Sequence, residues 1–275
     1  MTPDAQADDA ATPDGGVAVR VTAISAGADH TCALLSNRTA LCWGANDLGQ
    51  LGDGTRIPRS LPTPVLSADG MSVLDEVDSI AAGAGHTCAV RAGVVWCWGR
   101  NDWGQLGNGE EDTDSATPVR VLAFDRVAIL AGAIAVRAGD NNTCALMTDT
   151  TVQCWGLHIG RCSVSGDCNN DVAGPVSLLG DVRSLEVGTE VGCVATGGGA
   201  AWCWGDNAHS AVGDGLSTSY AFRPESVRAA RVVGEPMGTA ILVDALAVAV
   251  GSRHACAART GRPAVCWGDN RSLQL

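Results

Sequence analysis

The sequence contains no lysine, and its eighteen basic residues are all arginine, against thirty aspartate and glutamate residues. The formal net charge is therefore −12, and the sequence pI is about 4.7. Sequence-independent binding to nucleic acid or to an anionic membrane depends on cationic footprints. The composition thus predicts no nucleic-acid partner and no anionic-membrane partner.

A long apolar run is also absent, which argues against membrane insertion because a spanning helix needs about twenty apolar residues. The longest run, Val127 to Val136, has ten residues, and we expect it to form a buried strand. Residues 1–16 are acidic, rich in Ala, Pro and Asp, and lack the apolar region of a secretory signal. They predict a disordered acidic linker that resembles the spacer behind the signal of surface-anchored bacterial proteins. We expect the natural start to lie upstream.

Residue sets of common catalytic and metal sites are missing as well. There is no Ser/His/Asp set on matched loops, no repeated carboxylate pair with a base, and no CxxC motif. Three His-x-Cys triplets, at His30, His86 and His254, leave zinc as an alternative. The third and fourth copies of the same segment carry Asn142 and Val191 instead, so we predict no metal, no cofactor and no enzymatic activity.

A repeated segment dominates what is present. The first copy, AISAGADHTCALLSNRTALCWGANDLGQLGDG from Ala23 to Gly54, recurs four more times. The first cysteines of the copies, Cys32, Cys88, Cys144, Cys193 and Cys256, are spaced by 56, 56, 49 and 63 residues. A Gly-punctuated repeat near fifty residues with short apolar runs predicts an all-β propeller of about five recognisable blades.

Each copy contains a predicted β-hairpin that brings two cysteines face to face. In the second copy the turn is Arg91-Ala-Gly-Val94, which places Cys88 opposite Cys97 with Cα atoms about 4.5 Å apart, close enough for a disulfide. The other turns, SNR, TDT, GGG and TGR, fit three-residue loops with a bulge. The predicted disulfides are Cys32–Cys42, Cys88–Cys97, Cys144–Cys154, Cys193–Cys203 and Cys256–Cys266, with a sixth, Cys162–Cys168, across a short loop.

Buried free thiols are the alternative, but five facing pairs favour disulfides, which persist mainly outside the reducing cytosol. The sequence therefore predicts a periplasmic, cell-surface or secreted protein. Five of the eight tryptophans directly follow the second cysteine of a pair: Trp43, Trp98, Trp155, Trp204 and Trp267. We expect these rings to pack between blades. Segments such as PTPVL and ATPVRVL are expected to be strands that begin at their proline.

A glycine-rich loop follows each WG pair, and two copies of it are closely alike. They are Gly44-Ala-Asn46-Asp-Leu-Gly49-Gln50-Leu51-Gly52-Asp53-Gly54 and Gly99-Arg-Asn101-Asp-Trp-Gly104-Gln105-Leu106-Gly107-Asn108-Gly109. Both resemble the signature of the regulator of chromosome condensation repeat, whose propellers typically have seven blades. The resemblance covers residues 17–275 and weakens in the last three copies. The third copy replaces the loop with the segment that contains Cys162 and Cys168.

The resemblance implies a propeller that binds partners through its loops. We expect an extracytoplasmic, monomeric recognition or scaffold module for a protein or glycan. The alternative is guanine-nucleotide exchange on a small GTPase, the activity of the founding member, and a propeller hydrolase or lyase ranks lower. The candidate partner-binding loop carries Arg100, Asp102 and Trp103, since Arg and Trp are over-represented among interface hot spots.

The sequence is compatible with two arrangements of the ring. Either Val17 to Ser25 supplies a strand that closes a five-bladed ring, or the chain is part of a larger ring. Five copies are fewer than seven, which favours the second arrangement.

Overall fold

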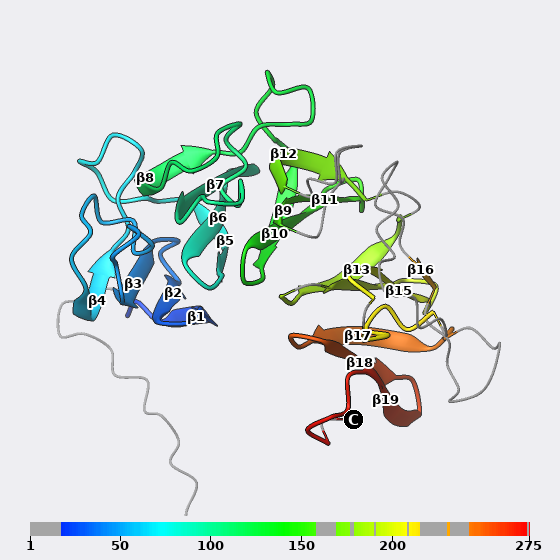
Figure 1. The fold of residues 1–275 in the computed structure, drawn as a ribbon. Coiled ribbons are helices and arrows are strands. Elements are labelled where there is room, and N and C mark those ends of the chain that lie inside the picture. The colour runs from blue at the N-terminus through cyan, green and yellow to red at the C-terminus, as the bar shows by residue number, and fades with distance from the viewer. Residues whose placement is uncertain are drawn as a thin grey trace, which may run out of the picture.

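The structure is a computed structural model that describes residues 18–157, 169–176, 179–189, 191–207, 209–214, 230–231, 242–273 and 275. Within these ranges the chain forms nineteen strands and no helix. The strands make five antiparallel sheets, four of them four-stranded and one three-stranded in the described residues. Figure 1 shows the sheets side by side around an arc, with an opening between the first sheet and the last. The predicted all-β propeller is confirmed, and we call the sheets blades 1 to 5.

The strands of the first three blades are as follows. Blade 1 holds β1 (Val21–Ala26), β2 (His30–Leu35), β3 (Ala40–Gly44) and β4 (Arg59–Pro64). Blade 2 holds β5 (Val77–Ala82), β6 (His86–Arg91), β7 (Val94–Gly99) and β8 (Ser115–Arg120). Blade 3 holds β9 (Ala133–Ala138), β10 (Asn142–Met147), β11 (Val152–Leu157) and β12 (Asn169–Pro175).

The last two blades continue the pattern. Blade 4 holds β13 (Val182–Val187), β14 (Val191–Thr196), β15 (Ala201–Gly205) and β16 (Ala230–Arg231). Blade 5 holds β17 (Ala245–Val250), β18 (His254–Arg259) and β19 (Arg262–Gly268). Strand order within each blade follows the chain. Because β1 pairs with β2 inside blade 1 and the ring stays open (Figure 1), closure of a five-bladed ring by Val17 to Ser25 is not what the structure shows.

The five predicted hairpin cysteine pairs are disulfides. Their Cα atoms lie 4.0 to 4.1 Å apart, and none of the described cysteines is free. The turn of blade 2 has positive φ at both central residues, 48° at Ala92 and 78° at Gly93, as a two-residue hairpin requires. The three-residue turns of blades 1, 3 and 4 are confirmed by backbone hydrogen bonds such as the one from Leu35 N to Thr39 O.

Three local expectations are wrong. The run from Val127 to Val136 is not one buried strand, because β9 begins at Ala133 and Val127 is 84% exposed. In blade 5, Arg259 pairs with Arg262, which leaves a two-residue turn and moves the irregularity into the strand between Ala257 and Arg259. The proline segments begin their strands earlier than expected, so Pro64 ends β4 and Pro118 lies inside β8. These strands tolerate proline because each is the outermost of its blade and has one free edge.

The core lies between neighbouring blades. The disulfide face of one blade packs against the tryptophan face of the next, so that Cys32 and Cys42 share a cluster with Ile80 and Trp98. Trp98 and Trp155 are fully buried, and Trp204 is nearly so, whereas Trp43 and Trp267 are half-buried. The prediction of one ring packed between blades is confirmed at the inner junctions.

Some predicted features lie outside the described residues. They are the tail over residues 1–16 and the pair Cys162–Cys168. No helix that is long and apolar enough to cross a bilayer occurs in the part of the chain that the structure describes.

Disulfide mapping tests the redox state. Peptide mass spectrometry of non-reduced protein should find the five hairpin disulfides and the predicted Cys162–Cys168 bridge, each joining neighbouring cysteines. Breaking one hairpin bridge should cost about 2 to 3 kcal/mol of unfolding free energy, because the loops that the bridges close are short. Free thiols at more than one pair in exported protein would contradict this assignment.

Substitution of two tryptophans tests the core. Trp98→Ala should lower the unfolding free energy by about 3 to 5 kcal/mol, because it leaves a large cavity between blades 1 and 2. The matched variant Trp103→Ala, in the half-buried loop after β7, should change it little. Equal losses in chemical denaturation would show that the interblade ring is not the main packing residue.

Candidate functional site

Two buried histidines link neighbouring blades. Each bonds to a threonine of the next blade, and that threonine donates to a backbone oxygen of a glycine-rich loop. His30 Nε2 lies 2.8 Å from Thr87 Oγ1, and that hydroxyl donates to the backbone oxygen of Gln50 at 2.8 Å. Trp98 Nε1 donates to the same oxygen at 2.9 Å. Because the threonine hydrogen is used on Gln50, His30 must donate from Nε2. We call this set the junction relay.

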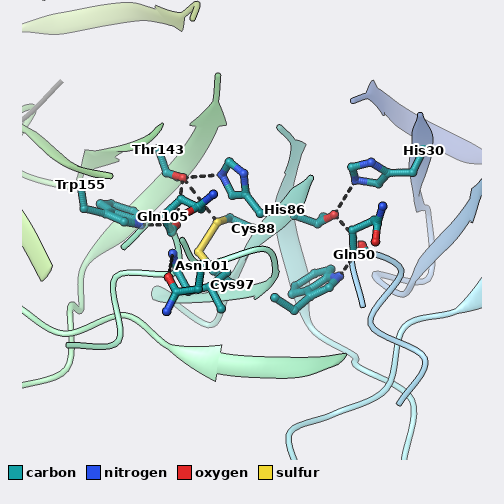
Figure 2. The surroundings of a disulfide bond; sticks show 12 residues. His30, Gln50, His86, Cys88, Cys97, Asn101, Gln105, Thr143 and Trp155 are labelled. Carbon is teal, nitrogen blue, oxygen red and sulfur yellow. Dashed lines mark hydrogen bonds between the residues drawn. A yellow bond between two sulfur atoms is a disulfide. The ribbon is translucent and has the colours of Figure 1, made fainter. Parts of the chain in front are cut away.

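Figure 2 shows the relay repeated one blade further on. His86 Nε2 lies 2.8 Å from Thr143 Oγ1, and Trp155 Nε1 donates to Gln105 O at 2.9 Å. The cysteines of these His-x-Cys triplets are disulfide-bonded, so they cannot supply zinc thiolates. The zinc alternative is therefore wrong for these triplets.

Burial keeps the relay histidines neutral. Both rings are buried, His30 at 3% exposure and His86 at 0%. Burial lowers the pKa of His30 to about 4, although the charge of Asp29 opposes the shift. Burial, helped by the nearby charges of His30 and Arg100, lowers the pKa of His86 to about 3.

The junction between blades 3 and 4 departs from this pattern. Asn142 replaces the histidine and donates through Nδ2 to Thr189 O at 2.8 Å. Gly192 takes the position of Thr87, and the Trp204 ring lies so close that a β-carbon there would overlap it. Trp204 Nε1 has no hydrogen-bond partner in the described residues. In the described residues, the Asn142 hydrogen bond and packing against Trp204 connect these two blades, and the threonine of the relay is replaced by Gly192.

The same junctions shape a hollow at the centre of the arc. Each blade contributes the last residue of its inner strand and the two residues that follow it. The hollow has a volume of about 340 Å³. A β-carbon on Gly27, Gly83, Gly139 or Gly188 would overlap the carbonyl oxygen of the equivalent glycine in the next blade. Small residues therefore line most of the hollow, and its polar side chains are Asp140, Thr189 and Ser252.

The glycine-rich loops are held rigidly by their asparagines. Asn46 Oδ1 accepts from Leu51 N at 3.0 Å, and Asn46 Nδ2 donates to Asp53 and to the backbone of Ile57. Gly49, Gly52 and Gly54 have φ of 82°, 69° and 75°, which favours glycine at these positions. The Asn46 side chain therefore holds the loop closed.

Equivalent asparagines hold the later loops. Their side-chain oxygens accept from the backbone N of the residue five positions on: Asn101 from Leu106, Asn207 from Val212, and Asn270 from Leu275.

The predicted partner-binding loop brings Arg100, Asp102 and Trp103 together. Arg100 and Asp102 form an ion pair at 2.5 Å with side chains 34% and 42% exposed. Trp103 is half-buried, and its backbone N donates to Gln105 Oε1 at 2.8 Å. The stem of Arg100 packs beside Gly85, next to the Leu48 side chain of blade 1. The loop thus presents a paired arginine and carboxylate beside a half-buried indole.

Charge is distributed unevenly between the two ends of the arc. We define the signature-loop face as the end where the inner strands finish and the glycine-rich loops lie, and the hairpin face as the opposite end. The described part of the signature-loop face carries twelve carboxylates, Asp29, Asp47, Asp53, Asp102, Glu110, Glu111, Asp112, Asp114, Asp140, Asp206, Asp214 and Asp269, and five arginines, Arg56, Arg59, Arg100, Arg253 and Arg271.

The hairpin face is balanced by comparison. Its described residues include six carboxylates, Asp75, Glu76, Asp78, Asp149, Asp181 and Asp244, and seven arginines, Arg20, Arg38, Arg91, Arg120, Arg183, Arg259 and Arg262. The connector after β8 is counted with neither face, because its Arg126 contacts Gly109 O and Asp171. Arginines of the signature-loop face lie beside carboxylates of the same face, as the ion pairs of Arg56, Arg59, Arg100 and Arg271 show. The acidic excess therefore concentrates where the loops and the hollow are.

Sequence reasoning missed both the hollow and this asymmetry. The charges are spread along the chain, and they gather on one face only because alternate strand ends meet there. The strand order within each repeat was the signal that could have revealed it.

Comparison with known proteins agrees with the fold. The arc of four-stranded sheets with repeated junctions defines a β-propeller. Models described as "Regulator of chromosome condensation (RCC1) repeat" match residues 21–50, 39–90 and 92–146. The chain is thus a propeller of the regulator of chromosome condensation repeat family.

Similar proteins include two large curated relatives. The mouse E3 ubiquitin-protein ligase HERC2 is 30% identical over 263 residues, which covers 94% of this chain and 5% of the relative. The Arabidopsis thaliana ultraviolet-B receptor UVR8 is 30% identical over 222 residues, which covers 78% of this chain and 47% of the receptor. The chain therefore spans less than half the length of either relative.

A solved structure supports the fold alone. A chain in the crystal structure of Kap60 bound to yeast RCC1 (Prp20) superposes with a TM-score of 0.70 at 20% identity, and the match covers 94% of this chain and 58% of that chain.

The buried histidines predict acid sensitivity. Their folded pKa values lie below the unfolded value of 6.5, so stability is full above pH 6.5 and falls as the pH drops toward 4. Each histidine should cost about 2 kcal/mol between pH 6.5 and pH 5, a range above most carboxylate pKa values. Urea unfolding at a series of pH values measures this loss.

The chain itself supplies the control. His30→Asn with His86→Asn places at both sites the residue that blade 3 uses at Asn142. This variant should lose most of the slope between pH 6.5 and 5, whatever its stability at pH 7. An unchanged slope would assign the acid sensitivity to other groups.

Proposed function

We propose that this chain is a non-enzymatic protein-recognition module that works outside the cytoplasm and binds a cationic partner through its signature-loop face. The observation that carries the proposal is the excess of carboxylates on that face. A face of one charge sign steers an oppositely charged partner and rejects one of like charge. Anionic nucleic acid is disfavoured as a partner for the same reason.

Rigid loops support recognition by this face. The asparagine and glycine network fixes the backbone of each loop, so little conformational entropy is lost on binding. The side chains of Asp47, Leu48, Asp102 and Trp103 make no hydrogen bond within that network, to which Leu48 and Trp103 contribute only their backbone N. We propose Arg100, Asp102 and Trp103 as one contact loop, with the indole as the apolar anchor.

The disulfides support an extracytoplasmic compartment. Five hairpin disulfides would be unstable to reduction in most cytosols, which supports a periplasmic, surface or secreted location. The relatives are called a ubiquitin ligase and an ultraviolet-B receptor, and a structural neighbour is crystallised with Kap60. Proteins with such different names are similar to this chain, which supports partner binding as the general role.

A labelled oligo-arginine peptide tests the charged face. Fluorescence anisotropy should show binding that weakens with added salt, and an oligo-glutamate peptide should not bind. Asp29→Asn, Asp47→Asn and Asp140→Asn together should weaken binding by tenfold or more, a loss of about 1.4 kcal/mol. Trp103→Ala with Arg100→Ala tests the contact loop and should weaken binding of a natural partner without shifting the unfolding midpoint.

The matched control removes three carboxylates from the hairpin face. Asp75→Asn, Asp78→Asn and Asp181→Asn change the net charge equally and should leave peptide binding nearly intact. Equal losses in both triple variants would contradict a localised site. Accelerated nucleotide release from a small GTPase would instead support the exchange-factor alternative, which places the family's founding activity in this chain.

A further inference from the structure

The hollow at the centre of the arc is walled by groups that accept hydrogen bonds. The carbonyl oxygens of Gly83, Gly139, Gly188 and Gly251 each lie against the equivalent glycine of the preceding blade. None of these oxygens accepts a hydrogen bond from an N–H or O–H group of the described residues. A carbonyl oxygen has two lone pairs, and contact with a glycine Cα–H uses them only weakly. These carbonyls therefore keep most of their capacity to accept.

Three side-chain acceptors without donors lie directly behind this wall. His30 Nδ1, His86 Nδ1 and Asn142 Oδ1 are buried and have no hydrogen-bond partner in the described residues. They lie 2.4 to 2.7 Å from the point that a β-carbon would occupy on the nearest glycine of the hollow. The Nδ1 atoms are acceptors because Nε2 carries the hydrogen that bonds to the threonine. Buried acceptors of this kind act on the hollow through their partial negative charge.

The formal charge at the hollow has the same sign. Asp140 lines the hollow, and Asp29 lies one residue beyond its lining. Both side chains are exposed, and neither forms an ion pair with a described residue. No arginine or histidine is among the described residues that line the hollow. Arg253 follows the lining of blade 5 in the sequence, and its charge acts on Asp269.

We propose that this hollow is a binding site for the guanidinium group of an arginine side chain from a partner protein. Guanidinium has several N–H donors in one plane, no acceptor and a permanent charge, which matches acceptors contributed by several blades. An ammonium group donates from a single point and is more strongly hydrated, so it fits less well. The cation is organic, because the described residues contain no group of three His, Cys, Asp or Glu side chains that could hold a metal ion.

The hollow belongs to the signature-loop face, because its lining is the ends of the inner strands and the two residues beyond each. The inference therefore rests on the proposed function, and it names the group of the cationic partner and the place where that group binds. The volume of about 340 Å³ lies within the range of about 300 to 1,000 Å³ that is usual for small-ligand sites. The hydroxyls of Thr189 and Ser252 are available as further acceptors.

Filling the hollow without changing the net charge tests this assignment. Ala28 and Ser252 line the hollow and are exposed, so a larger side chain can be placed at either position without displacing the core. Ala28→Leu and Ser252→Leu, made separately, should each weaken binding of the labelled oligo-arginine peptide by about tenfold, because leucine would occupy the space of the guanidinium.

The matched control enlarges a side chain of the same face outside the hollow. Ala45→Leu changes the position that Arg100 occupies in blade 2, so a larger side chain is tolerated there. It should change peptide binding by less than about twofold. Unfolding midpoints of the three leucine variants should match that of the unchanged chain, which verifies that each variant folds.

Competition identifies the group that binds. N-acetyl-arginine amide should displace the labelled peptide from the unchanged chain, whereas the citrulline analogue, which has a similar shape and no charge, should not. The lysine analogue should need a severalfold higher concentration than the arginine analogue. A glycine peptide with a single arginine should compete at a severalfold lower concentration than N-acetyl-arginine amide, because its backbone also reaches the surrounding loops. Equal competition by these two would overturn the assignment to a protein side chain.

Two further results would overturn the inference and leave the proposed function in place. One is unchanged peptide binding in both Ala28→Leu and Ser252→Leu. The other is equal competition by the arginine and citrulline analogues. If the unchanged chain bound no oligo-arginine peptide at all, the proposed function would be contradicted, and the inference with it.

Discussion

The backbone oxygen of Gln50 is the point on which one junction of this protein depends. It accepts from Trp98 and Thr87 of the next blade while its own loop is fixed by Asn46, and Gln105 repeats the arrangement. If this oxygen were displaced, the buried indole and hydroxyl would both lose their acceptor, which costs more than the bonds themselves contribute. The glycine-rich loop, the indole, the threonine and the histidine therefore depend on one another. The buried polar groups of one blade find their partners only in the neighbouring blade.

That dependence explains what the sequence could predict. The disulfide register, the buried tryptophans and the loop asparagines all follow from residues that recur at fixed offsets within one repeat. Cys88 and Cys97 are nine positions apart, so the hairpin turn alone decides that they face each other. Local patterns of this kind need no knowledge of the whole ring, and they defined the blades correctly.

Other features depend on what surrounds the repeat, and the sequence concealed them. Trp43 is more exposed than Trp98 because no blade covers it. In the sequence both tryptophans directly follow the second cysteine of a pair, in the triplets LCW and WCW. Pro118 is tolerated inside β8 because that strand has a free edge. The acidic face arises from carboxylates that belong to different blades and meet only in the assembled arc.

The division of labour within each loop links stability to recognition. Glycines, Asn46 and the Gln50 backbone are committed to the junction, so changes there act on the fold. Two positions lie between them in each loop: Asp47 and Leu48 in blade 1, and Asp102 and Trp103 in blade 2. Leu48 and Trp103 contribute only their backbone N to the network, and the two aspartates contribute no group to it. Their side chains can differ between blades at little cost to folding. A face built in this way can carry a different residue on each of its loops, and it is this freedom that allows a strictly repetitive scaffold to present a non-repetitive surface to a partner.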